Sequence, residues 1–120
     1  MSEGVHHHHQ IDYIEFSVTE MKVAQEFYGN AFGWEFTDYA PAYSGINVGG
    51  REVGGLRLDT PKLGGPLVVL YSDDLDATAR GVLRAGGTIS IEPFDFPGGR
   101  RFHFLDPSGN ELAVWGKPAD

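Results

Sequence analysis

Charged side chains interrupt three runs of the sequence that otherwise alternate like strands. Glu15, Arg57 and His103 each stand next to apolar neighbours in such a run. Since side chains alternate across a strand, we expect all three on the face opposite the apolar residues. A carboxylate or imidazole there could act as general acid or base, and a guanidinium could hold a substrate anion. We therefore take Glu15 and His103 as candidate catalytic residues and Arg57 as a candidate substrate-binding residue; a structural ion pair or hydrogen bond is the alternative for each.

Several aromatic and apolar residues are expected on the same face as these charged groups. Rings with polar tips often line pockets for small ligands. The further candidate substrate-binding residues are Tyr13, Val69, Tyr71, Ala113 and Trp115. The same rings could instead fill the space, in which case the domain would serve as a scaffold or dimerisation unit.

The hydrophobic pattern predicts the elements that carry these residues. Alternation of apolar and polar residues favours strands at 11–18, 34–39, 43–48, 52–58, 67–71 and 88–91, the last ended by Pro93 before a loop at 95–99. Apolar residues at helical spacing favour helices at 20–32 and 74–85, each followed by glycine. Asp106-Pro107-Ser108-Gly109 has the residue preferences of a type I turn and predicts a hairpin between two final strands.

The two halves of the chain repeat the order strand, helix, strand, strand, strand. They can be overlaid without a gap, with Met21 on Leu75 and Gly33 on Gly87. Each half alone would leave a sheet face and a helix stripe uncovered, so the two are expected to share one domain. We predict an α+β fold with modules at about 11–60 and 66–117.

Composition excludes several classes of function. The chain has 120 residues, a net charge of −8 and no cysteine. The acidity argues against nucleic acid or an anionic membrane as partner, and no apolar run is long enough to span a membrane. The lack of cysteine suits a reducing cytoplasm. Residues 1–10, with histidines at 6–9, are expected to be a disordered or tag-like leader, or else an incidental transition-metal site.

Three groups of motifs carry a family resemblance over nearly the whole chain. They are Phe27-Tyr28 with Phe32-Gly33-Trp34-Glu35-Phe36, Asp73-Asp74-Leu75-Asp76-Ala77 with Ala85-Gly86-Gly87, and Phe104-Leu105-Asp106-Pro107-Ser108-Gly109-Asn110. Together they resemble the vicinal oxygen chelate superfamily, which includes glyoxalases, bleomycin-resistance proteins and extradiol dioxygenases, and in particular small proteins related to lactoylglutathione lyase. The resemblance implies two βαβββ modules forming a cupped mixed sheet around a central hollow, and a homodimer.

The same resemblance bears on metal binding. In metal-using members, His and Glu ligands come from the inward faces of the first and fourth strands of each module. The matching positions here hold Tyr13, Leu67 and Ala113, and the remaining position falls on Gly55, Arg57 or Asp59. Leucine and alanine have no donor atoms, and tyrosine is not a usual ligand for these metals. We therefore expect no metal and no other cofactor.

Three functions are consistent with these observations. The first is a glyoxalase-like protein that binds a small organic molecule in the hollow, with lyase or isomerase chemistry that uses no metal. The second is a non-catalytic protein of the resistance type that sequesters an aromatic or cationic compound. The third is a metal-dependent lyase or dioxygenase with a shifted site built from Glu15, His103 and Glu111.

Overall fold

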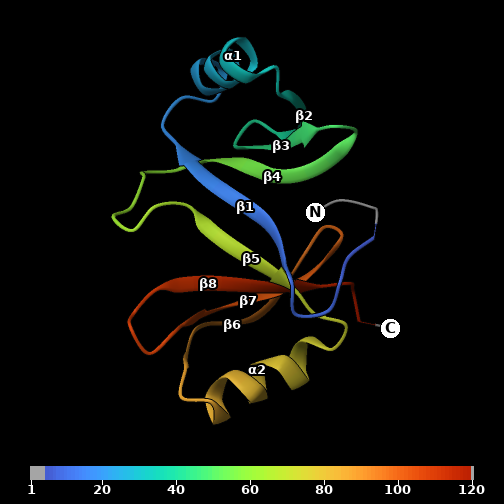
Figure 1. Cartoon of the computed structure of the whole chain (residues 1–120), viewed down its shortest axis with the longest axis vertical. Helices are drawn as coiled ribbons and strands as arrows, with labels where there is room; N and C mark the ends of the chain where they lie inside the picture. The colour runs from blue at the N-terminus through green and yellow to red at the C-terminus, as the bar shows by residue number, and fades with distance from the viewer. Residues whose placement is uncertain (1–4, 120) are drawn as a thin grey trace. The chain divides into compact units, whose positions relative to one another are not determined.

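The computed structural model describes residues 5–119 and divides into two compact units (Figure 1). The first unit includes Tyr13–Pro66, and the second combines Val5–Asp12 with Leu67–Asp120. Each unit contributes one helix and four strands of mixed direction. Positions 1–4 of the expected leader lie outside the described residues.

The first unit is a βαβββ module. Its elements are β1 (Ile11–Val18, which begins just before the unit boundary), α1 (Met21–Phe32), β2 (Glu35–Ala40), β3 (Tyr43–Val48) and β4 (Arg51–Leu58). The strand order is β2-β3-β4-β1, with β1 parallel to β4 and the other pairs antiparallel. Ala24 of α1 packs with Ile46 and Leu56 to form the core of this unit.

The second unit repeats this arrangement. Its elements are β5 (Leu67–Tyr71), α2 (Leu75–Arg84), β6 (Thr88–Phe96), β7 (Gly99–Leu105) and β8 (Glu111–Gly116). The strand order is β5-β8-β7-β6, with β5 parallel to β8. Leu75 of α2 packs with Phe102 and Val114 to form the core of this unit. The predicted α+β fold of two βαβββ modules is confirmed.

The hairpin between β7 and β8 has the predicted turn. The Gly109 amide donates to the Asp106 carbonyl oxygen at 2.9 Å, the bond that closes a four-residue turn. The Asp106 carboxylate also accepts from the backbone amides of Ser108 and Asn110, each at 2.9 Å. The side-chain amide of Asn110, which donates to Asp106 at 2.9 Å, makes the largest contribution to a lowered pKa of Asp106, and the backbone bonds add to it.

Strand β6 is longer than the sequence predicts. It continues through Pro93 to Phe96, and its pairing with β7 shifts register between Ile91 and Phe94. Since β6 is the last strand in the order of its unit, proline at this irregularity costs no central ladder bond. The expectation that Pro93 ends the strand is wrong for this reason.

The internal repeat changes its spacing along the chain. Met21 and Leu75, which match in the gap-free overlay, each begin a helix. In the last strand of each unit the equivalent residues are Leu56, paired with Phe16, and Val114, paired with Leu70. These two lie farther apart in the sequence than Met21 and Leu75, because the second unit has longer middle strands, β6 and β7, and a longer turn before its last strand.

The segment before β1 is part of the second unit. The His9 amide donates to the Tyr71 carbonyl at 2.7 Å, and the Tyr71 amide donates to the Gln10 carbonyl at 3.1 Å. His9 and Gln10 of the expected leader are therefore bound to the end of β5 by backbone hydrogen bonds. Neither helix of the described chain is long and apolar enough to span a membrane.

Candidate functional site

Seven of the eight residues predicted to form the site are buried. Tyr13, Glu15, Val69, Tyr71, His103, Ala113 and Trp115 are at most 6% exposed. A ligand can reach these seven only if neighbouring side chains move. Arg57 is the exception, with 52% of its side chain exposed.

Glu15 and Arg57 lie on neighbouring parallel strands of the first unit. The Arg57 Nη1 atom is 3.8 Å from Glu15 Oε1, and Arg57 Nε is 4.0 Å from Asp59 Oδ2. These are ion-pair distances, longer than direct hydrogen bonds. The pair therefore neutralises a buried carboxylate while part of the guanidinium faces solvent.

Two phenols lie beside this ion pair. The hydroxyl groups of Tyr13 and Tyr43 are 2.8 Å apart, and the Tyr43 hydroxyl donates to Glu15 at 3.5 Å. Burial, followed by the neighbouring Tyr43, strongly raises the pKa of Tyr13. The Tyr13 hydroxyl thus keeps its proton and acts as a neutral hydrogen-bonding group.

A second buried carboxylate lies in the same unit and was not predicted. The Tyr39 hydroxyl donates to Glu52, which is 5% exposed. A Cβ on Gly45 would collide with the Glu52 carboxylate, so the missing side chain provides the room for it. The glycine within β3 was the signal available in the sequence, because glycine inside a strand often marks such a close approach.

In the second unit, His103 is held between a cation and a carboxylate. Arg101 Nε donates to His103 Nε2 at 3.1 Å, and His103 Nδ1 is 3.2 Å from Glu111 Oε2. Arginine can only donate, so Nε2 must accept and Nδ1 must carry the proton that is donated to Glu111. His103 is therefore a neutral imidazole in a fixed tautomer, and sequence reasoning did not single out its partner Arg101.

Tyr71 and Trp115 form an aromatic contact with a residue of the expected leader. Their ring centroids are 5.1 Å apart, and the His6 ring lies 5.1 Å from Tyr71 and 4.9 Å from Trp115. Asp12 accepts from the Trp115 indole at 2.9 Å and lies 2.7 Å from His6 Nδ1. The sequence pattern assigned Asp12 to no site, and it assigned His6 only to an incidental metal site of the leader.

The strand register settles which residues stand at the family's metal-ligand positions. Ala113 of β8 pairs with Val69 of β5, and in the first unit Gly55 of β4 pairs with Glu15 of β1. Gly55 therefore corresponds to Ala113, which leaves Tyr13, Gly55, Leu67 and Ala113 at the four positions. A Cβ at Gly55 would lie 2.7 Å from the Tyr13 hydroxyl oxygen.

These four residues do not fit a metal ion. Gly55, Leu67 and Ala113 have no side-chain donor, and Tyr13 keeps its proton. Nor do any three His, Asp or Glu side chains of residues 5–119 gather in positions that could bind a metal. The structure therefore gives no support to the shifted site of Glu15, His103 and Glu111.

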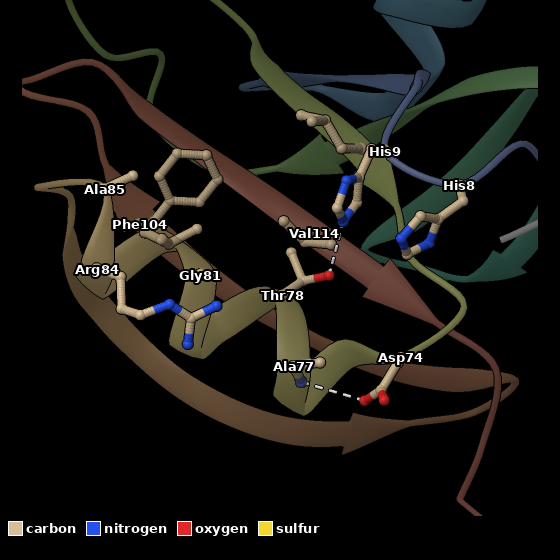
Figure 2. A pocket seen from close by; sticks show the side chains of 12 residues that line it. His8, His9, Asp74, Ala77, Thr78, Gly81, Arg84, Ala85, Phe104 and Val114 are labelled. Atoms are coloured by element: carbon tan, nitrogen blue, oxygen red, sulfur yellow. Dashed lines mark hydrogen bonds between the residues drawn. The ribbon is translucent and has the colours of Figure 1, made fainter.

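A cavity of about 510 Å³ lies in the second unit beside α2, and none of the predicted site residues lines it (Figure 2). Figure 2 shows its apolar side chains, Phe104 and Val114, with the polar groups of Thr78 and Asp74 near one end. His9 Nε2 is 3.0 Å from the Thr78 hydroxyl, and the Asp74 carboxylate caps α2 by accepting from the Ala77 amide at 3.1 Å. Thr78 and Asp74 thus already have hydrogen-bond partners, and Arg84 adds a guanidinium to the lining.

Two repeated βαβββ units, each with its first strand parallel to its last, define a class of protein. The family model described as "Glyoxalase/Bleomycin resistance protein/Dioxygenase superfamily" matches residues 10–114. The chain belongs to this superfamily, which confirms the resemblance found in its motifs.

The curated relatives that match this chain have different functional descriptions. It is 31% identical to the anthracycline biosynthesis protein DnrV of Streptomyces peucetius, over 82% of this chain and 43% of the relative. It is 24% identical to the putative glyoxylase CFP32 of Mycobacterium tuberculosis, over 87% of this chain and 44% of the relative. The chain thus spans less than half the length of these two relatives.

Solved structures share the fold at low sequence identity. The Mn(II)-bound glyoxalase of Novosphingobium aromaticivorans has a TM-score of 0.68 and 23% identity, over 97% of this chain and 42% of the other. Methylmalonyl-CoA epimerase of Mycobacterium tuberculosis has a TM-score of 0.70 and 19% identity, over 92% of this chain and 88% of the other. At these identities the likeness establishes the fold alone.

Proposed function

We propose that this chain binds a small organic molecule with an anionic or strongly polar oxygen, and that Arg57 anchors it. The supporting observation is the Glu15–Arg57 pair: a glutamate whose side chain is 4% exposed lies beside an arginine whose side chain is 52% exposed. The planar guanidinium can bind a carboxylate or enolate oxygen through two N–H groups. Glu15 keeps Arg57 on the polar face of β4 when no ligand is bound.

The same pair could serve a lyase or isomerase reaction. On a substrate with an acidic C–H beside a carbonyl, Glu15 would accept the proton and Arg57 would stabilise the enolate oxygen. Return of the proton from Glu15 to carbon would complete an isomerisation. A relative named as a putative glyoxylase supports this candidate. Three of the four positions that correspond to the family's metal ligands have no side-chain donor here, which favours a reaction performed by side chains without a metal.

A second candidate function is sequestration without turnover. It is favoured by two relatives named as anthracycline biosynthesis proteins and by the paired rings of Tyr71 and Trp115. A net charge of −8 would also attract a cationic aromatic compound.

Thermal-shift screening followed by calorimetry tests both candidates. The panel contains 2-oxo carboxylates, a short acyl-CoA thioester and an anthracycline, each also assayed for turnover. We expect Arg57→Met to weaken the binding of an anionic ligand about 10- to 100-fold, as loss of a charged hydrogen bond does. Arg80→Met is the matched control, since Arg80 is exposed on α2 and should leave affinity unchanged.

Glu15→Gln separates binding from chemistry. The amide should retain ligand binding and abolish turnover if Glu15 is the base, whereas a sequestering protein shows no turnover before or after the change. An anionic ligand that binds Arg57→Met as tightly as the unaltered protein would refute the anchoring role.

We also propose that the protein is a cytoplasmic homodimer. The relatives DnrV and CFP32 are more than twice as long as the matched region, and a second copy would supply a comparable number of modules. Light scattering at micromolar concentration should give twice the mass of one chain, 13.1 kDa. A monomer under these conditions contradicts the proposal.

A further inference from the structure

His6 occupies a polar aromatic box in the second unit. We use the name ring box for Tyr71, Trp115 and Asp12. The imidazole of His6 stacks on Tyr71 at an interplanar angle of 25° and meets Trp115 edge-on at 87°. Its Nδ1 atom is 2.7 Å from Asp12 Oδ1, and the side chains of His6 and Asp12 are only 2% and 5% exposed.

The members of the ring box are held by contacts that do not involve His6. Tyr71 and Trp115 are register partners on β5 and β8, and their rings meet at 69°. The Trp115 indole donates to Asp12 Oδ2 at 2.9 Å, which fixes the carboxylate relative to the ring. His6, by contrast, lies in a segment with neither helix nor strand. The ring box is thus held in place without His6, whereas His6 belongs to a segment without regular secondary structure.

The chemistry of the ring box suits a flat cation. Aromatic faces attract positive charge, and a carboxylate takes a charged N–H donor. The charged groups near the box include Asp12, Asp73 and Arg101, which pairs with Trp115 across β7 and β8 and donates to His103. Burial, then Asp73 and Asp12, raise the pKa of Tyr71, so this ring stays neutral and both charges that act on it are negative.

We propose that Tyr71, Trp115 and Asp12 form a binding site for a planar protonated nitrogen heterocycle, and that His6 occupies this site as an internal ligand. This site lies wholly in the second unit, deepens the second candidate function by naming its ligand class and residues, and does not involve Arg57. An external heterocycle would replace the His6 ring. The backbone bonds of His9 and Gln10 to Tyr71 can remain, because they lie beyond the residue that is displaced.

Removal of the internal ligand tests the proposal. The probes are imidazole at about pH 5.5, roughly one unit below the ordinary pKa of an imidazole side chain, and pyrazole, which has the same size and is neutral there. Binding is followed by the NMR signal of the Trp115 indole N–H, assigned with Trp34→Phe. In His6→Ala we expect saturable binding of imidazolium at least 10-fold tighter than binding of pyrazole.

Two further variants serve as controls. His8→Ala removes a neighbouring histidine that bonds to the Asp73 amide at 2.9 Å, and it should bind imidazolium as weakly as the unaltered chain, at least 10-fold weaker than His6→Ala. Asp12→Asn in the His6→Ala background should abolish the preference for imidazolium over pyrazole. Equal affinity for both probes in folded His6→Ala, or no binding of either, overturns the proposal.

The unaltered protein provides a second route if His6→Ala does not fold. Rising imidazole should shift the Trp115 indole signal together with the His6 ring signals, which should approach those of a solvent-exposed histidine. Imidazole that shifts neither signal overturns the proposal. Arg57→Met should bind imidazolium like the unaltered chain, so this test and the test of the anchoring role can fail separately.

Discussion

Tyr39 shows how one buried acceptor changes the chemistry of an exposed ring. Although 56% of Tyr39 is exposed, its hydroxyl bonds to the buried Glu52. Desolvation, followed by the hydrogen bond and charge of Glu52, raises the pKa of Tyr39 from 10.0 to about 12. Ionisation of this phenol would place two negative charges together in the first unit.

The raised pKa predicts a loss of stability in alkali. The contribution of Tyr39 is fully present below its unfolded pKa of 10.0 and is lost as the pH rises through about 12. We expect Tyr39→Phe to remove this part of the pH dependence of the unfolding free energy. Denaturant titrations at a series of pH values from about 9 to 12 will measure the unfolding free energy of each variant, with Tyr28→Phe as control. An unchanged alkaline slope in Tyr39→Phe contradicts the assignment.

At the scale of single residues, the sequence could predict faces but few partners. Alternation along β1 and β4 placed Glu15 and Arg57 on one face, and the structure brings them to 3.8 Å. The Tyr13–Tyr43 bond depends on strand register and a glycine at position 55, neither of which alternation specifies. His6 and Trp115 lie near opposite ends of the chain, so no local pattern could connect the two.

Parallel pairing of β1 with β4 depends on a glycine without room for a side chain. A Cβ on Gly54 would collide with the backbone carbonyl oxygen of Ile14, its register partner. A backbone atom in a paired strand cannot move aside as a side chain could. Gly54 is therefore required for the close approach of the two strands.

We predict that Gly54→Ala destabilises the protein by about 3 kcal/mol or more, the upper range for overpacking. Gly81→Ala is the matched control: its Cβ would meet only the Arg84 side chain at 3.8 Å, within helix α2. That change should stabilise by about 0.5–1 kcal/mol, since alanine favours helix over glycine. Thermal and denaturant unfolding will compare the two. A neutral Gly54→Ala would mean that the strands can separate at little cost.

The elements themselves were largely predictable, and the exceptions have physical causes. The Asp106–Gly109 turn and the first helix follow from local residue preferences that tertiary contacts do not oppose. The extension of β6 past Pro93 depends on its place at the end of the sheet order. A local rule that proline ends strands cannot contain that information.

For the whole molecule, the segment before β1 contributes hydrogen bonds to the folded second unit. His9 and Gln10 exchange backbone hydrogen bonds with Tyr71, and His6 bonds to Asp12. We predict that removal of residues 1–9 lowers the free energy of unfolding by roughly 1–3 kcal/mol, as expected for loss of buried hydrogen bonds. Removal of residues 1–4 alone is the reference, so that the difference between the two truncations isolates residues 5–9. Equal melting temperatures for both truncations contradict the prediction.

The order of elements in the two modules was predictable because the hydrophobic pattern repeats along the sequence, whereas the membership of each unit was not. Apolar periodicity marks two modules, and the structure confirms their order of elements. Periodicity does not show that Val5–Asp12 belongs with the later module, since that depends on contacts with residues far along the chain.

This membership has a consequence for folding during synthesis. The first unit can close its sheet once β4 has left the ribosome, because β4 is the partner of β1. Residues 5–12 must wait for β5 and β8, and the bond between Asp12 and Trp115 spans 103 residues. Closure over such a distance is slow compared with local contacts. Residues 5–12 are therefore translated before β5 and β8 but are among the last to reach their native positions.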